Sequence, residues 1–136
     1  MSILGIDYGE KRIGIAISDP GEIISLPQEP IPSMGIKKDS VTISKLVDQK
    51  DIKLIVIGLP LTLSGKFGYQ AKFISDFENQ LKTQTSKPIT KFDERLTTKQ
   101  AKNELNNSKK AKSKIDSIAA CIMLQTFLDS RKSGVT

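Results

Sequence analysis

The sequence of 136 residues contains no histidine and a single cysteine, and both features restrict its chemistry. Without histidine there is no Ser-His-Asp triad, no imidazole general base and no histidine metal ligand. The one cysteine, Cys121, allows neither an intrachain disulfide nor a cysteine-cluster zinc site. Its alanine, isoleucine and methionine neighbours predict a packing residue, not a reactive thiol. Any hydrolytic chemistry must use carboxylates, lysine, hydroxyls or a bound metal.

Long hydrophobic runs are also missing from the sequence. No apolar run approaches the ~20 residues that a membrane-spanning helix needs. The chain begins directly with a strand pattern instead of a signal peptide. We therefore expect a cytoplasmic protein without a membrane partner. The length suits one domain over residues 1–136, and 38% hydrophobic with 26% charged residues predicts a globular fold.

The positive charge is concentrated in the last part of the chain. Residues 1–86 hold ten basic and ten acidic side chains, whereas residues 87–136 hold eleven basic and five acidic ones. The whole net charge of +6 therefore belongs to the last 50 residues. Such an asymmetry favours a polyanion, nucleic acid before membrane surface, although basic domains also exist that bind neither.

Two predicted strands open the chain as a hairpin. Residues 3–8 are apolar, a glycine breaks the pattern, and isoleucines alternate with small residues over 12–18. This alternation predicts two antiparallel strands. The small residues indicate an element packed closely against the other face. An extended piece over 23–31, interrupted by two prolines, suits an edge strand.

Strands alternating with helices follow the hairpin. The apolar run at 53–57 is typical of a buried parallel strand. The last predicted helix has apolar residues around most of its circumference, which predicts burial against a sheet. Together the elements predict an α/β fold with a mixed sheet of about five strands. The predicted helices cover 38–49, 69–82, 97–107 and 115–128, and the strands after the hairpin region cover 53–57 and 89–92.

Four acidic residues lie near predicted strand ends or at the start of the last helix. Asp7 closes the first strand within an apolar stretch, where a carboxylate needs a partner or a cation; alternatively it accepts bonds from amides of the following turn. Asp93 and Glu94 lie at the end of a predicted strand, which is where ligands bind in open α/β sheets. Alternatively, they interact with the dipole of the next helix. Asp116 can equally be an ordinary first-turn acid.

Carboxylates at two strand ends and at a helix start can converge on one point. Oxygen ligands without histidine or cysteine favour Mg²⁺ or Mn²⁺ over zinc. Two such ions roughly 4 Å apart would activate a water and stabilise the leaving oxygen in phosphodiester cleavage. The acids are therefore compatible with a metal-dependent nuclease, and spacing alone also allows each of them a structural role.

Two further segments are candidates for contact with a nucleic-acid backbone. The loop over 59–67 lacks the G-x-x-x-x-G-K-[ST] pattern of a phosphate-binding loop. It is either a loop that positions a phosphate beside the acids or a plain loop. Residues 98–114 contain six lysines opposed by one glutamate. This run is either solvated surface or a set of phosphate contacts directly before Asp116.

Several short motifs occur in a characteristic order along the chain. They are Ile6-Asp7-Tyr8-Gly9, Lys11-Arg12-Ile13-Gly14-Ile15-Ala16, Ile57-Gly58-Leu59-Pro60, Asp93-Glu94-Arg95-Leu96-Thr97-Thr98, Asp116-Ser117-Ile118-Ala119-Ala120 and Leu124-Gln125. The most specific motifs are D-E-R-L-T-T and the following D-x-x-A-A. With these motifs the sequence from Ile3 to Leu128 resembles the YqgF/RuvX family, whose members are bacterial pre-16S rRNA nucleases, also described as Holliday junction resolvase-like.

The resemblance implies an RNase H-like fold, with a five-stranded mixed sheet flanked by helices, and a role in maturing the 5′ end of 16S rRNA. Asp7, Glu94 and Asp116 match the acids assigned to catalysis in that family, so they are the expected ligands of Mg²⁺ or Mn²⁺. Phosphate contacts are expected from basic residues of the motifs and of the lysine-rich segment, namely Lys11, Arg12, Arg95, Lys109, Lys110, Lys112 and Lys114.

The sequence departs from the family pattern in two places. After Gly-Leu-Pro the family often has a polar residue followed by Asp-Gly, whereas this chain has Thr62-Leu63-Ser64-Gly65. The segment before the last acid is often rich in arginine and glycine, whereas residues 106–114 use only lysine as the basic residue. Lysine binds phosphate as a point charge and not as a bidentate fork, which weakens the positioning of RNA there.

The leading hypothesis is a metal-dependent endonuclease acting on pre-rRNA as a monomer or homodimer. A second hypothesis is a non-catalytic RNA-binding factor in ribosome assembly, which would show salt-sensitive RNA binding and no metal-dependent turnover. A third is a Holliday junction resolvase-like nuclease, which would act on branched DNA as a symmetric dimer.

Overall fold

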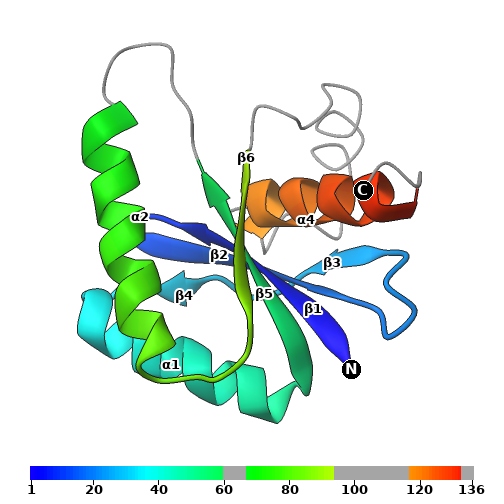
Figure 1. Ribbon diagram of the computed structural model, residues 1–136, viewed down its shortest axis with the longest axis horizontal. Coiled ribbons are helices and arrows are strands. Elements are labelled where there is room, and N and C mark those ends of the chain that lie inside the picture. Colours follow the sequence, from blue (N-terminus) through cyan, green and yellow to red (C-terminus); the bar gives the residue numbers. More distant parts are fainter. Residues whose placement is uncertain (60–66, 94–116, 133–136) are drawn as a thin grey trace.

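A computed structural model describes residues 1–59, 67–93 and 117–132, and it places a sheet between two layers of helices (Figure 1). Helices α1 and α2 cover one face of the sheet, and α4 covers the other. The helices are α1 (Ile36–Gln49), α2 (Phe67–Lys82) and α4 (Ile118–Lys132). The strands are β1 (Ser2–Tyr8), β2 (Arg12–Ser18), β3 (Ser25–Pro27), β4 (Ile31–Pro32), β5 (Ile52–Leu59) and β6 (Ile89–Asp93).

The strand order β3-β2-β1-β5-β6 makes β1 the central strand of a mixed sheet. The predicted hairpin is confirmed: β1 and β2 are antiparallel, with Asp7 opposite Gly14. A Cβ on Gly9 would lie 2.6 Å from the carbonyl oxygen of Arg12, so only glycine fits this turn. The pairs β1–β5 and β5–β6 are parallel, so these three strands end at the same edge of the sheet.

The predicted edge strand over 23–31 is divided into β3 and β4, which both pair with β2. The sheet therefore has six strands but is five strands wide. Proline has no backbone N–H to donate to a ladder, and Pro27 and Pro30 lie at the end of β3 and just before β4. Between the two pieces the N–H of Gln28 still donates to the carbonyl of Ile15, at 2.8 Å.

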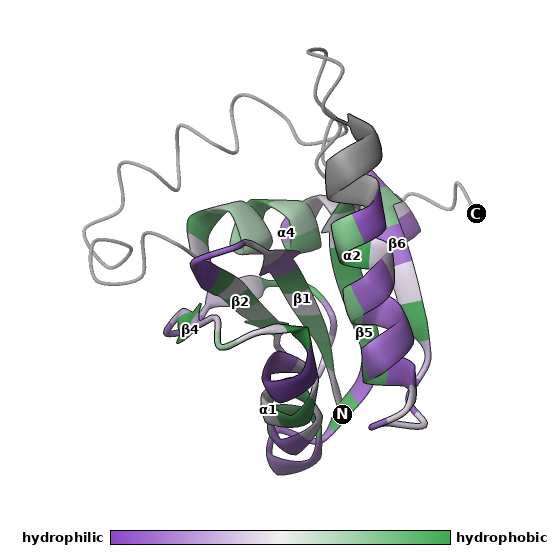
Figure 2. Cartoon of the chain, turned by 90° about the vertical axis from the view of Figure 1, so that its left-hand side faces the viewer, coloured by the Kyte–Doolittle hydropathy of each residue, from purple (hydrophilic) through white to green (hydrophobic). Residues whose placement is uncertain are grey.

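The alternation of side chains along the strands creates two hydrophobic cores. Leu4 and Ile6 face α1 and α2, whereas Ile3 faces α4. A Cβ on Gly5 would lie only 2.9 Å from the Cβ of Leu124, so α4 lies directly on the backbone of β1. The close packing expected from the small residues of the hairpin is thus confirmed. Figure 2 shows α4 largely hydrophobic, whereas the outward sides of α1 and α2 are largely hydrophilic.

The boundaries of two helices differ from the prediction. Helix α1 begins two residues early, at Ile36, because its N-cap is Gly35, which supplies no side-chain cap to mark the start. Helix α4 continues to Lys132, four residues beyond its predicted end. The helix predicted over 97–107 lies outside the described residues. Within the described ranges, no helix is long and apolar enough to cross a membrane.

A side chain of α4 closes the outer edge of β3. The N–H of Ser25 donates to Oε1 of Gln125 at 2.9 Å, and Nε2 of Gln125 donates to the carbonyl of Ile23 at 3.0 Å. The carboxamide therefore pairs with the strand backbone as a neighbouring strand would. One turn earlier, Cys121 is buried against Ser25, and burial raises the pKa of its thiol. Cys121 is thus a packing residue, as predicted.

Candidate active site

Asp7 lies near the carboxyl end of β1, at the edge of the sheet where the parallel strands β5 and β6 also end. It shares the α4 side of the sheet with Gly5, because residues two apart on a strand point to one face. Its partner on β2 is Gly14, and on β5 the residue after the Ile6–Ile57 pair is Gly58. Glycine therefore lies opposite this half-buried carboxylate on both neighbouring strands.

An open cleft of about 530 Å³ adjoins Asp7, and its walls carry both signs of charge. Among the described residues, those that line it are Asp7, Gly9, Lys11 and Arg12. Lys11 and Arg12 are exposed and project from the hairpin, and both were predicted to contact phosphates. The structure thus brings together three of the predicted site residues, one carboxylate and two cations. This combination suits a polyanionic ligand held next to an acid.

Asp93 lies on the other side of the sheet from Asp7. In β6, Phe92 packs in the core under α4, whereas Lys91 forms an ion pair with Glu78 of α2 at 3.3 Å. Alternation therefore directs Asp93, the last residue of β6, to the side of α1 and α2. Its pairing with Leu59, which packs in that same core, leads to the same orientation. The pleat of β6 argues against Asp93 as a partner of Asp7.

The first turn of α4 is anchored beside Asp7 by a serine that the sequence analysis did not single out. The backbone N–H of Ile15 donates to Oγ of Ser117 at 3.0 Å, and Ser117 is fully buried. Ile15 directly follows Gly14, the strand partner of Asp7. The only signal in the sequence was the place of Ser117 within the D-S-I-A-A motif. Its bonding partner is 102 residues away, and no local pattern predicts that.

Tyr8, next to Asp7, is fixed on the opposite face by a buried carboxylate. Its hydroxyl donates to Oδ2 of Asp39 at 2.7 Å, and its ring stacks on Phe77 with centroids 4.0 Å apart. Asp39 also accepts bonds from the hydroxyl of Ser33 (2.6 Å) and the N–H of Met34 (2.8 Å). Burial, and then the hydrogen bond to Asp39, raises the pKa of Tyr8, so its hydroxyl remains a donor. These contacts hold the end of β1 in place.

The other predicted site residues lie outside the described residues: Glu94, Arg95, Lys109, Lys110, Lys112, Lys114 and Asp116. Residues 60–66 of the glycine-containing loop are outside them as well. Within the described ranges, no group of three or more histidine, cysteine, aspartate or glutamate side chains could hold a metal. This part of the chain therefore contributes Asp7 alone from the predicted ligand set.

Comparison with known proteins gives the family. A family model described as RuvX, Holliday junction resolvase, matches residues 1–130. The chain belongs to the RuvX family. One relative, from Chloroflexus aggregans, is 40% identical over 136 residues, which cover 97% of this chain and 96% of the relative. Another, from Protochlamydia amoebophila, is 42% identical over 142 residues, covering 95% and 93% of the two chains. Both carry the name "Putative pre-16S rRNA nuclease".

Solved structures with a similar fold include two resolvases. RuvC of T. thermophilus, in complex with a Holliday junction substrate, has a TM-score of 0.72 at 10% identity, with 98% of this RuvX-family chain and 96% of RuvC covered. The fowlpox virus resolvase, in complex with Holliday junction DNA, has a TM-score of 0.59 at 13% identity, with 96% and 99% covered. At such identities the likeness concerns the fold alone. The expected RNase H-like fold is confirmed.

Proposed function

We propose that this RuvX-family protein is a metal-dependent endonuclease that cleaves precursor 16S rRNA during maturation of its 5′ end. The observation that carries the proposal is the cleft in which Asp7 of the central strand lies beside Lys11 and Arg12. Membership of the RuvX family and the names of the relatives support a nuclease and its rRNA substrate.

The donor chemistry of the proposed ligands fits Mg²⁺ or Mn²⁺. Asp7, Glu94 and Asp116 offer only carboxylate oxygens, which hard divalent ions prefer. Asp7 has the setting that such a ligand needs, because it is half-buried, opens onto a cleft and has glycine as its β2 partner. Glu94 follows the last residue of β6, and Asp116 is joined to the anchored Ser117 by one peptide bond. When bound, such an ion lowers the pKa of a coordinated water and neutralises charge on phosphoryl oxygens.

The residues of the chain itself bind and orient the substrate. Lys11 and Arg12 attract the phosphates of the RNA strand to the cleft, and the planar guanidinium of Arg12 suits bidentate contact with one phosphate. Gly9 leaves the backbone of the turn accessible to the strand, since it has no side chain. The contacts proposed to continue along the RNA come from Arg95, Lys109, Lys110, Lys112 and Lys114.

The test is cleavage of a labelled precursor rRNA fragment with Mg²⁺ or Mn²⁺, beside a four-way DNA junction as the competing substrate. We expect Asp7→Asn to reduce the rate of cleavage by more than the roughly 10–100-fold that is typical when a residue that only orients a metal ligand is replaced. The exposed Asp48 on α1 provides the matched control, and Asp48→Asn should cleave as the wild type does. Unchanged cleavage by Asp7→Asn would contradict the proposal. Cleavage of the DNA junction but not of the RNA would show that the substrate is branched DNA and not precursor rRNA.

A further inference from the structure

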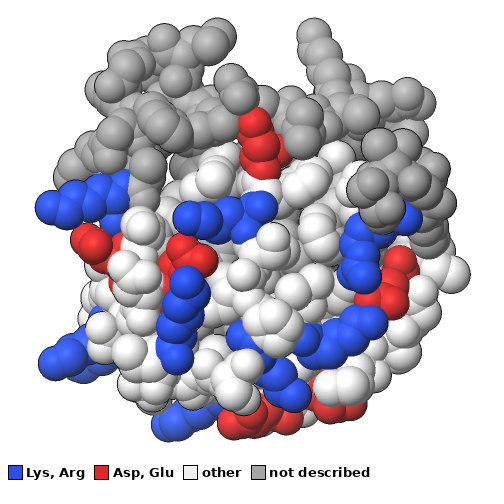
Figure 3. Space-filling model, viewed as in Figure 1, with Lys and Arg blue, Asp and Glu red and all other residues white. Residues whose placement is uncertain are grey.

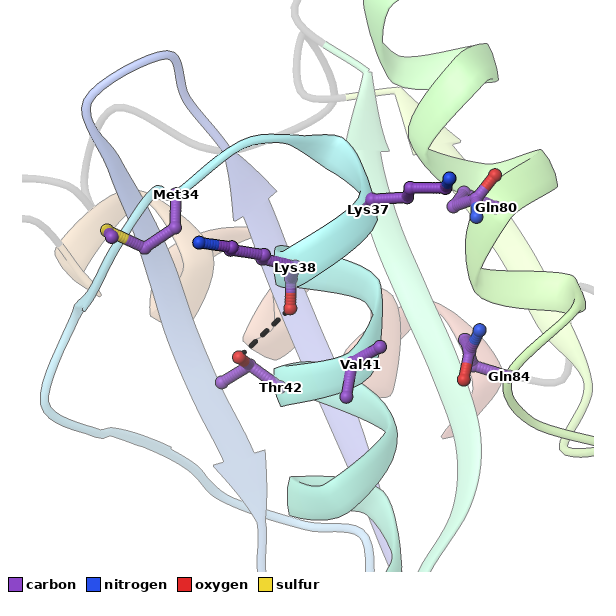
Figure 4. A pocket seen from close by; sticks show the side chains of 7 residues that line it. All are labelled: Met34, Lys37, Lys38, Val41, Thr42, Gln80 and Gln84. Atoms are coloured by element: carbon purple, nitrogen blue, oxygen red, sulfur yellow. Dashed lines mark hydrogen bonds between the residues drawn. The ribbon is translucent and has the colours of Figure 1, made fainter.

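A second open cavity, a groove of about 490 Å³, lies between helices α1 and α2 (Figure 4). Its apolar part consists of Met34 and Val41, which are 66% and 38% exposed. Two lysines flank this part: Lys37 extends toward Gln80 of α2, and Lys38 extends toward Met34 (Figure 4). We call the surface formed by these residues and Gln84 the α1/α2 groove. Exposed apolar side chains beside two cations suit a ligand with both apolar and anionic parts.

The two lysines of the groove belong to the start of α1. The N-cap residue Gly35 makes no side-chain hydrogen bond to the first turn. Lys37 and Lys38 lie in that turn. The one carboxylate of the first turn, Asp39, is buried and accepts bonds from Tyr8, Ser33 and Met34, so it is directed inward.

One backbone contact connects the α1/α2 groove with the Asp7 cleft, across the edge of the sheet at which β1 ends. The N–H of Ser33 donates to the carbonyl oxygen of Lys11 at 2.9 Å, and Met34 is the next residue. Lys11 lines the cleft, and Met34 lines the groove. The basic pair Lys11 and Arg12 therefore lies on one side of this contact, and the basic pair Lys37 and Lys38 lies on the other, three and four residues after Met34. Elsewhere, on the face shown in Figure 3, basic and acidic side chains are interspersed over the described residues.

We propose that the α1/α2 groove binds a single-stranded flank of the RNA strand that is held in the Asp7 cleft. The phosphates contact Lys37 and Lys38, and an unpaired base lies against Met34 and Val41. This inference rests on the proposed function and narrows its substrate class to RNA with unpaired nucleotides beside the cleavage point. A single strand is required because duplex RNA keeps its bases stacked, away from an apolar surface. The contact between Ser33 and Lys11, which joins the groove to the basic cleft, favours RNA over an acidic protein segment.

The test measures RNA binding in EDTA, so that it does not depend on cleavage. The probe is a fluorescent RNA hairpin with a single-stranded extension, and the blunt hairpin is the reference. We expect Lys37→Ala/Lys38→Ala to weaken binding of the extended hairpin about 25-fold at 0.1 M salt, because two phosphate contacts contribute about 1.4 to the slope of log K against log salt, and this slope over the decade below 1 M salt is a factor of about 25. The matched control is Lys45→Ala/Lys50→Ala, at exposed positions further along the same helix and at its C-cap.

A second variant addresses the apolar part of the groove. Val41→Glu adds a carboxylate at an exposed position without removing a lysine. We expect it to weaken binding of the extended hairpin and to leave binding of the blunt hairpin unchanged. Equal affinities of wild type and the Lys37/Lys38 variant would overturn the proposal. So would lysine-dependent binding of a poly-glutamate peptide with unchanged RNA binding. Lysine-dependent binding of the extended RNA by a protein that cleaves no RNA would support the groove and overturn only the nuclease proposal.

Discussion

The buried hydrogen bond between Ser117 and Ile15, at the start of α4, allows a quantitative prediction of how much stability its removal costs. Ser117→Ala removes the acceptor of the Ile15 N–H, a bond of 3.0 Å between residues that are 0% and 1% exposed. A buried donor left without a partner costs about 1–3 kcal/mol. For a chain of this size, with a urea m-value of about 2 kcal/mol/M, a loss of about 2 kcal/mol lowers the unfolding midpoint by about 1 M.

The same substitution should also weaken metal binding, because Asp116 precedes Ser117 by one peptide bond. We expect the dissociation constant for Mn²⁺, measured by calorimetry on the folded protein, to rise about tenfold, as is typical when a residue that orients a metal ligand is lost. Thr126→Ala provides the control: its hydroxyl bonds to the carbonyl of Ile122 within α4, so both quantities should change little.

Two results would refute this reasoning. An unchanged urea midpoint in Ser117→Ala would show that the bond to Ile15 does not stabilise the fold. A lower midpoint with unchanged Mn²⁺ affinity would show that the anchor stabilises α4 without positioning Asp116.

Two further substitutions test the packing around β1. Gly5→Ala should lower the free energy of unfolding by about 1–3 kcal/mol, measured with urea, because its Cβ would lie 2.9 Å from the Cβ of Leu124; unchanged stability would contradict the direct contact of α4 with β1. Tyr8→Phe should change the pH dependence of stability above pH 10. The pKa of Tyr8 is raised in the folded protein above its unfolded value of 10.0, so its contribution is complete below pH 10 and is lost as the pH rises through the folded pKa. We expect the wild type to lose about 1 kcal/mol more stability than Tyr8→Phe between pH 10 and pH 11, measured by urea titration. Parallel curves would contradict the raised pKa of Tyr8.

Local patterns in the sequence predicted most of the fold. The alternation of Ile13, Ile15 and Ile17 identified β2, and the apolar run before Gly58 identified β5 as buried and parallel. The start of α1 was missed because Gly35 is not a typical cap, and the division of the edge strand depends on how Pro27 and its neighbours pair with β2. Periodicity therefore predicts elements better than it predicts where they end.

The part of the candidate site that could be predicted consists of residues whose type and local sequence pattern indicate their role. An aspartate at the end of an apolar strand indicated Asp7, and the resemblance to the family added Lys11 and Arg12. Ser117 and Asp39 were missed, because each acts through a partner that only the fold brings near. Ile15 is 102 residues from Ser117, and Tyr8 is 31 residues from Asp39. The sequence also could not assign Asp93 to a face, which depends on the pleat of β6.

The carboxamide of Gln125 has a consequence for how copies of the protein behave at high concentration. An open outer strand is a template on which another chain can form β-structure, and such pairing is a common start of aggregation. In this protein two backbone groups that would receive the incoming strand, the N–H of Ser25 and the carbonyl of Ile23, are already bonded to Gln125. The blocking group belongs to α4, the helix whose first turn is anchored by Ser117 beside Asp7. A shift of this helix would therefore break the bond to Ile15, next to the strand partner of Asp7, and leave the backbone groups of Ser25 and Ile23 open to another chain at the same time.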